Sequence, residues 1–182
     1  MIRIAAFLVA SAGIAWISRR CLRAPRSHGF YRFFAFEFIL AEAALNAPYW
    51  FRDPFGPRQM ASWFLLCVSI WPAVAGLRAL VTAGRPSAES SDPAQLGFEK
   101  TTALVASGLY RYIRHPMYAS LIALAWGVAL KDLSAPSITL AAAATMALVA
   151  TALAEERENL ARFGPSYAEY MKSTRRFVSF VF

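Results

Sequence analysis

The segment MASWFLLCVSIWPAVAGLRALVT, residues 60–82, decides the fold class because it is long, apolar and almost free of charge. Arg78 is its only charged residue. A helix of about 20 mostly apolar residues is long enough to cross the hydrocarbon part of a bilayer. The segment therefore predicts a membrane-spanning helix, and the rest of the chain repeats the pattern.

Four further apolar segments of similar character lie at residues 2–18, 30–50, 116–130 and 133–154. Only Lys131 and Asp132 separate the last two, so these two are predicted to form a tight helical hairpin. The sequence thus predicts an all-α integral membrane protein with about five transmembrane helices. It divides into an N-terminal three-span region, residues 1–82, and a C-terminal region, residues 83–182, with two spans, a loop and a tail.

The composition excludes several other classes of protein. Apolar residues make up 58% of the 182 positions and charged residues only 16%, which argues against a disordered chain. The two cysteines, Cys21 and Cys67, are too few for a disulfide scaffold, and no CxxC pair indicates a metal. The net charge of +8 alone would suit a nucleic-acid-binding protein, but the apolar fraction argues against one. We therefore expect neither nucleic acid nor metal as a partner.

The distribution of basic residues predicts an orientation. With the N-terminus outside, 15 of the 19 Lys and Arg residues lie on the cytoplasmic side, as the positive-inside rule requires. The four that remain outside are Arg3, Arg52, Arg58 and Lys131. The basic cluster follows the first apolar segment rather than preceding it, which favours a retained span over the alternative of a cleaved signal peptide. The C-terminus is then cytoplasmic.

Little of the chain is left for a cofactor domain. Five spans leave about 80 residues in loops and tail, too few for a doubly wound nucleotide-binding domain. The GxGxxG motif of such domains is also missing. A cofactor site would have to be built from helix ends and from the two larger cytoplasmic pieces, residues 83–115 and 155–182.

The first of these pieces leads into SGLYRYIRHPMY, residues 107–118. Pro116 suits the first position of a helix, which places His115 at the cap. If the helix extends upstream, Arg111, Arg114 and Tyr118 share one face, and arginines near a helix N-terminus suit a carboxylate. The alternative is that the arginines only mark topology and that His115 only caps the helix.

The second piece begins with Glu155 and Glu156, directly after the fifth apolar segment. A helix C-terminus disfavours acidic residues, so topology does not explain this pair. We expect the pair to hold a cation such as an ammonium group or, in the alternative, to form solvated pairs with Arg157 or Arg162. An anion holder that faces a cation holder suggests an amino-acid zwitterion as the ligand.

These motifs resemble those of the isoprenylcysteine carboxyl methyltransferase family and its phospholipid methyltransferase relatives. The resemblance rests on GLYRYIRHPMY, the glutamate pair and RFGPSYAEYMKSTRRFV, and it covers residues 95–178. It implies an integral membrane enzyme that binds S-adenosylmethionine (SAM) between the cytoplasmic ends of its last spans without a Rossmann domain. The zwitterion would then be the methionine end of SAM.

The resemblance also implies which residues contact the cofactor. The positions that match the family's contacts are Gln95, Thr102, Ala103, Leu104, Val105, Tyr110, His115, Pro116, Met117, Tyr118 and Glu155. Two positions depart from the prenylcysteine enzymes, which have histidine at the place of Thr102 and a substrate-contacting arginine at the place of Thr151. The GxG element of the phospholipid branch is also absent around Gly108. The absence of that arginine at Thr151 puts a prenylcysteine carboxylate in doubt as the acceptor but leaves cofactor binding intact.

The function that follows is direct methyl transfer from SAM to a lipid-like or amphiphilic acceptor at the cytoplasmic membrane face. Arg114 and Glu156 are the candidate catalytic residues, which would orient the acceptor or take up its proton. One alternative is an NADPH-dependent enzyme similar to sterol reductases. Another is a non-enzymatic membrane protein with a degenerate methyltransferase fold. Sixteen arginines against three lysines suggest a GC-rich bacterium and hence its inner membrane, or the endoplasmic reticulum for a eukaryotic chain.

Two acidic residues within the second apolar segment need an explanation, because carboxylates are costly inside a membrane. Glu42 shares a helix face with Asn46 and either ties helices together or lines a substrate cavity. Glu37 is expected to have a structural role, for which Arg32 or Arg111 could be the partner.

Four further residues are assigned to the surface. His28, in the basic loop, is expected to be solvated. Phe163, Tyr167 and Tyr170 have helical spacing, and we expect them to dock the tail on the membrane interface rather than to bind a cofactor.

Overall fold

The computed structural model describes residues 2–84 and 103–177. Within these ranges the α-helices are α1 (Ile2–Ser18), α2 (His28–Asn46), α3 (Pro57–Ala83), α4 (Pro116–Ala129), α5 (Ala135–Phe163) and α6 (Pro165–Ser173). Short 3-10 turns lie at Cys21–Arg23, Ala47–Tyr49 and Gly108–Arg111. The described residues form no strand, and an isolated bridge joins Ile113 to Arg175. The prediction of an all-α chain is confirmed for this part of the protein.

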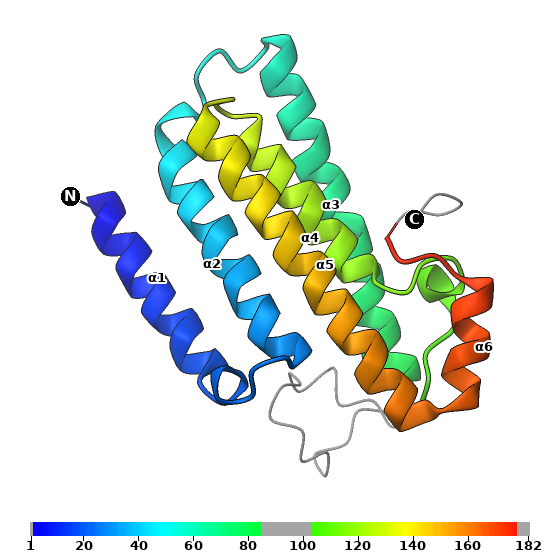
Figure 1. Ribbon diagram of the computed structural model, residues 1–182. Helices are drawn as coiled ribbons and strands as arrows, with labels where there is room; N and C mark the ends of the chain where they lie inside the picture. Colours follow the sequence, from blue (N-terminus) through cyan, green and yellow to red (C-terminus); the bar gives the residue numbers. More distant parts are fainter. Residues whose placement is uncertain (1, 85–102, 178–182) are drawn as a thin grey trace.

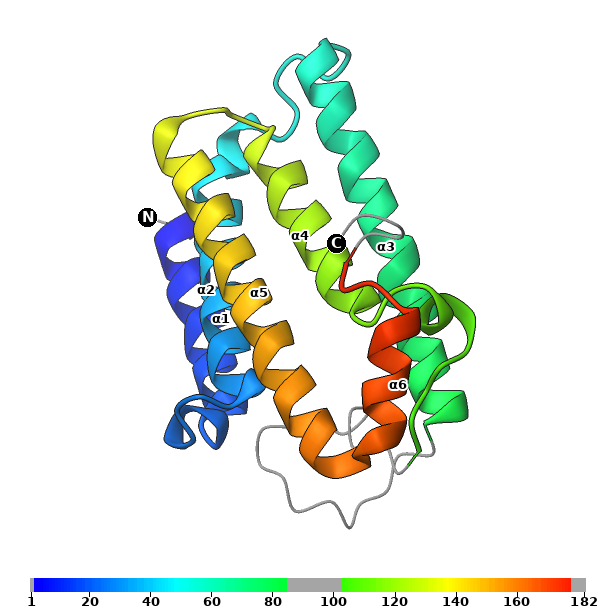
Figure 2. The same ribbon diagram turned by 45° about the vertical axis from the view of Figure 1, so that its right-hand side comes forward.

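The five long helices form one bundle, with α6 folded back beside the end of α5 (Figure 1). Helix α1 lies at one edge of the bundle and packs on α2, whereas α3 lies at the other edge and packs on α4 (Figures 1 and 2). Helix α5 packs against both α2 and α4 and so lies in the middle. The start of α4 and the end of α5 therefore meet at the same end of the bundle, beside α6.

Each apolar segment of the sequence forms one helix, and residues 2–18 form α1 with the predicted bounds. The tight hairpin between α4 and α5 is also confirmed, because Lys131 and Asp132 lie in its turn and their N–H groups bond to Val128 and Ala129. Helix α5 differs from the prediction, since it continues beyond residue 154 to Phe163. The residues after 154 are polar but helix-compatible, so they end the apolar stretch without ending the helix.

Two of the described helices, α3 and α5, are long and apolar enough to cross a membrane by length and composition. Helices α1 and α4 are apolar but shorter. Large apolar side chains on α1 and α3 are exposed, among them Trp16, Phe64 and Trp71. Exposed apolar patches on this scale indicate a surface that meets lipid or another protein.

The turn between α4 and α5 buries Lys131, one of the four basic residues that the sequence places on the outer side. Its side chain is 0% exposed. The Nζ atom donates to Oε1 of Gln59 over 3.1 Å and lies 3.5 Å from the ring centroid of Trp63 and 5.3 Å from that of Trp50. Aromatic rings attract a cation through their quadrupoles, so the contacts of Lys131 with Trp63 and Gln59 hold the hairpin against the start of α3.

Polar side chains tie the helices together elsewhere in the bundle. Asn46 on α2 donates to Ser137 on α5 over 2.7 Å and to the backbone oxygen of Val128 on α4 over 3.3 Å. This geometry supports the interhelical role for the face that Asn46 shares with Glu42. Glu37 accepts a hydrogen bond of 2.7 Å from Ser11 on α1, a partner other than the expected Arg32 or Arg111.

Candidate functional site

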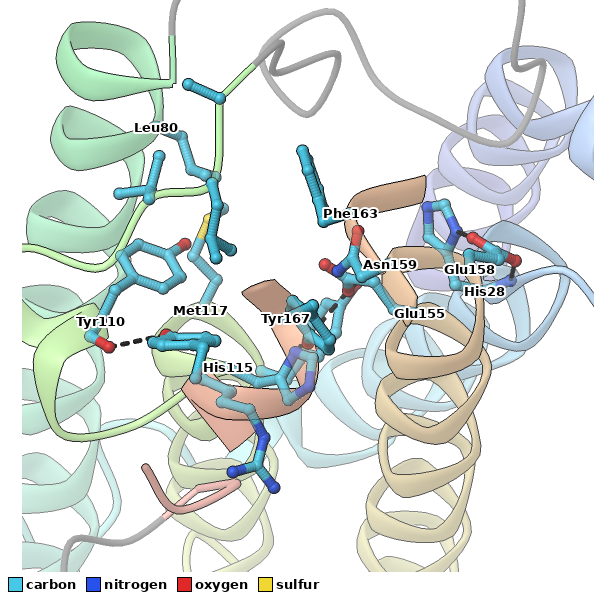
Figure 3. A pocket seen from close by; sticks show the side chains of 16 residues that line it. His28, Leu80, Tyr110, His115, Met117, Glu155, Glu158, Asn159, Phe163 and Tyr167 are labelled. Carbon is cyan, nitrogen blue, oxygen red and sulfur yellow. Dashed lines mark hydrogen bonds and ion pairs between the residues drawn. The ribbon is translucent and has the colours of Figure 1, made fainter. Parts of the chain in front are cut away.

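A pocket lies at the end of the bundle where α4 begins, and α2, α3, the segment before α4, α4, α5 and α6 all contribute to it (Figure 3). It encloses about 810 Å³, including space open to solvent. Its lining residues are His28, Leu80, Ala103, Leu104, Val105, Tyr110, Arg114, His115, Met117, Tyr118, Glu155, Glu158, Asn159, Phe163, Tyr167 and Tyr170.

The pocket has an apolar side and a polar side. Leu80, Tyr110 and Met117 lie on one side, while Glu155 and Asn159 reach in from α5 opposite them (Figure 3). Such a division suits a ligand with one flat apolar part and one charged part.

The segment before α4 reaches the pocket through a sharp backbone turn. Gly108 has a φ of +61°, in the left-handed region that favours glycine, and it opens the 3-10 turn Gly108–Arg111. Pro116 then begins α4, as the sequence predicts. Because the helix does not extend upstream of Pro116, Arg111 is exposed and does not line the pocket. The expected shared face of Arg111, Arg114 and Tyr118 is therefore wrong.

A carboxylate, a phenol and an imidazole form the centre of the polar side. The Tyr118 hydroxyl donates to Oε2 of Glu155 over 2.6 Å. The His115 ring stacks on the Tyr118 ring, with centroids 5.4 Å apart and planes inclined by 14°. Nδ1 of His115 lies 3.7 Å from Oε2 of Glu155. The Glu155 side chain is 30% exposed, so its charge remains available to a ligand.

Glu156 does not line the pocket and is almost fully buried. It accepts from Nε of Arg114 over 2.7 Å and from Nη2 of Arg176 over 2.9 Å. It borders a shallower hollow with Tyr31 and Leu153 instead. Burial alone would raise the pKa of Glu156, but the neighbouring His115, Arg176 and Arg114 together hold that pKa well below its ordinary value.

Glu156 does hold cations, as the sequence predicts, but these cations are arginine side chains of the same chain. Its partners are Arg114 and Arg176, not the Arg157 or Arg162 of the alternative interpretation. Arg114 does line the pocket, but its Nη1 atom is already engaged with the backbone oxygens of Thr174 and Met171, at 2.5 Å and 3.1 Å.

His28 corrects the prediction of a solvated histidine, because it is 2% exposed and lines the pocket. Glu158 accepts from its backbone N–H over 2.9 Å and also contacts its Nδ1 atom. The first N–H groups of a helix have no partner within the helix, so Glu158 caps the start of α2 from α5. The contact spans 130 positions in sequence, which no local pattern could reveal.

The three aromatic residues near the C-terminus also differ from expectation. Phe163, Tyr167 and Tyr170 line the pocket, and Tyr167 and Tyr170 are buried, so these two do not form an exposed face. Tyr170 donates to the backbone oxygen of Tyr110 over 2.6 Å, which joins α6 to the 3-10 turn. Burial raises the pKa of the Tyr167 hydroxyl, so this group stays protonated at neutral pH.

Most of the cofactor contacts that the family resemblance implies are brought together here. Among those within the described residues, all but Pro116 line the pocket. Pro116 is buried at the start of α4. Gln95 and Thr102 lie outside the described residues. Sequence reasoning missed His28, Leu80, Glu158 and Asn159, of which His28 and Leu80 come from the N-terminal region.

The described residues form a helical bundle in which two helices are long and apolar enough to cross a membrane, and a pocket lies where α4 begins and α5 ends. The model of the phospholipid methyltransferase family matches residues 58–166, which is more than half of the chain. The chain belongs to this family, and the family resemblance found in the sequence is confirmed. No curated protein and no solved structure matches the chain. His28 and Arg176 both lie outside the matched region.

Proposed function

We propose that this protein is a SAM-dependent membrane methyltransferase that methylates a lipid-like or amphiphilic acceptor at the cytoplasmic membrane face. The family makes it a membrane methyltransferase. The observation that carries the finer proposal is the convergence, around one pocket, of residues that the sequence motifs assign to SAM. These residues come from the segment before α4, from α4 itself and from α5.

The residues present fit the chemistry of SAM. SAM carries an ammonium and a sulfonium, and the exposed part of the Glu155 carboxylate offers the matching negative charge. Leu104, Val105 and Met117 provide an apolar wall suited to the adenosyl part. Tyr118, through its hydrogen bond, and His115, through its nearby ring, would orient the Glu155 carboxylate.

Bound SAM would supply an activated methyl group, and the protein then has little covalent chemistry to perform. Its contribution is to align the acceptor with the methyl group and to keep water out. Phe163, Tyr167 and Tyr170 are placed to exclude water from the pocket. We assign Arg114 and Glu156 to positioning rather than to contact with the acceptor, because they are paired with each other.

The proposed setting is a bilayer crossed by five helices, with the N-terminus outside and the pocket at the cytoplasmic end. The excess of basic residues around that end supports this orientation. An amphiphilic acceptor could then enter from the lipid while SAM enters from the cytosol. The arginine-rich composition supports a bacterial inner membrane.

Methyl labelling tests the function directly. Membranes that contain the protein are incubated with methyl-labelled SAM, and the labelled product is identified by mass spectrometry. The proposal predicts label in a lipid or other amphiphile, and loss of label with Glu155→Gln. Label that is equal in membranes without the protein would contradict it. An activity supported by NADPH instead would favour the reductase alternative.

A further inference from the structure

The C-terminal segment, residues 174–177, is hydrogen-bonded to the backbone just before α4. This segment lies beyond the region that the family model matches. The N–H of Arg114 donates to the oxygen of Arg175 over 2.7 Å, and the N–H of His115 donates to the oxygen of Arg176 over 3.1 Å. In return, the N–H of Arg175 donates to the oxygen of Tyr112 over 3.0 Å. The segment therefore runs parallel to the backbone that presents His115 to the pocket.

Arg176 adds a charged contact to this backbone pairing. Its Nε and Nη2 atoms donate to the two carboxylate oxygens of Glu156 over 3.2 Å and 2.9 Å. Paired contacts of this kind fix both the position and the plane of a carboxylate. The Glu156 side chain is 5% exposed, so the contact is shielded from competing water.

Glu156 in turn borders His115. Oε1 of Glu156 lies 3.4 Å from Nε2 of the His115 ring. Phe177, from the same C-terminal segment, contacts that ring with centroids 6.1 Å apart, and Tyr118 stacks on it. The position of His115 is thus set by groups on α4, on α5 and on the C-terminal segment.

We propose that Arg176 is a positioning residue of the pocket: it fixes Glu156, which with the C-terminal segment holds His115 against Tyr118 and beside Glu155. The effect on SAM rests on the proposed function, but the effect on His115 does not. Without the Arg176 guanidinium, Arg114 is the one arginine within the described residues that still pairs with Glu156, and the Glu156 carboxylate can turn away from the His115 ring.

The neighbouring Arg175 is a matched control. Its side chain is exposed, and backbone atoms of Arg175 make the hydrogen bonds to the segment before α4. Replacing Arg175 removes the same formal charge from the same segment without removing a contact to Glu156. A general effect of charge or of the C-terminal segment would therefore appear equally in Arg175→Gln and Arg176→Gln.

The first test uses the fact that the chain has only two histidines, His28 and His115. The purified protein in detergent is treated with diethyl pyrocarbonate, and the modification rate of each histidine is followed by mass spectrometry. With Arg176→Gln we expect the rate at His115, relative to His28, to rise about fivefold, because a charge-assisted contact that orders its surroundings is lost. The ratio should stay unchanged in Arg175→Gln. An unchanged ratio in Arg176→Gln would overturn the inference.

The second test separates positioning from mere stability. SAM affinity is measured by calorimetry beside thermal unfolding for wild type, Arg176→Gln and Arg176→Lys. We expect Arg176→Gln to weaken binding about fivefold and Arg176→Lys to restore only part of it, because lysine keeps the charge but not the paired geometry. A lower melting temperature with an unchanged dissociation constant would make the role purely structural. If wild type failed to bind SAM, the proposed function would fall, and the histidine ratio would still decide the role of Arg176.

Discussion

The hydroxyl of Tyr118 and the carboxylate of Glu155 are joined by a hydrogen bond of 2.6 Å between the first turn of α4 and the polar turns of α5. The bond satisfies one carboxylate oxygen and leaves the side chain 30% exposed toward the pocket. A negative charge that is oriented but still accessible is what a cationic ligand needs.

Glu155→Gln should therefore weaken SAM binding about tenfold, because an amide keeps the shape and the hydrogen bond but not the charge. Calorimetry in detergent measures the dissociation constant. Glu169→Gln is the control, since Glu169 is exposed on α6, where it pairs with Lys172. An affinity equal to wild type in Glu155→Gln would remove Glu155 from the proposed site.

The pair His28–Glu158 should be energetically coupled, because Glu158 contacts both the backbone and the ring of His28 at the start of α2. A double-mutant cycle with His28→Ala and Glu158→Ala is expected to give a coupling energy of about 1 kcal/mol or more. Chemical unfolding in mixed detergent provides the free energies. Additivity within about 0.3 kcal/mol would mean that the two side chains act independently.

The lowered pKa of Glu156 predicts how its contribution depends on pH. A depressed carboxyl pKa stabilises the fold fully above the ordinary value of 4.5, and this stabilisation is lost as the pH falls toward the lowered pKa. Wild type should therefore lose melting temperature more steeply than Glu156→Gln between about pH 5 and about pH 3. Parallel melting curves over that interval would show that Glu156 has an ordinary pKa.

The proposed orientation can be tested with two single cysteines in a background without Cys21 and Cys67. Leu133→Cys lies in the turn between α4 and α5, and Ser173→Cys lies at the end of α6. In intact cells a membrane-impermeant maleimide should label only Leu133→Cys. Ser173→Cys should react only after the membrane is opened. The reverse pattern would place the pocket on the outer side.

The sequence predicted the helices well because each apolar segment is long enough to mark one helix. The extension of α5 to Phe163 was not predicted, since the end of an apolar segment does not mark the end of a helix when polar, helix-compatible residues follow. This extension matters, because it carries Glu158 and Asn159 into the pocket.

The site was predictable where a local motif carries it, as in the segment around His115 and at Glu155. It was not predictable where contacts join distant parts of the chain. The partner of His28 is Glu158 on α5. Arg176, in the C-terminal segment, pairs with Glu156 on the same helix. Lys131 shows the same limit, since only packing against Trp63 reveals that its charge is buried.

Binding of SAM to the purified wild-type protein tests the central claim most directly. Calorimetry in detergent should show one site per chain, with SAM displaced by S-adenosylhomocysteine and unaffected by NADPH. Absence of SAM binding by a folded, monodisperse sample, or displacement of SAM by NADPH, would contradict the account.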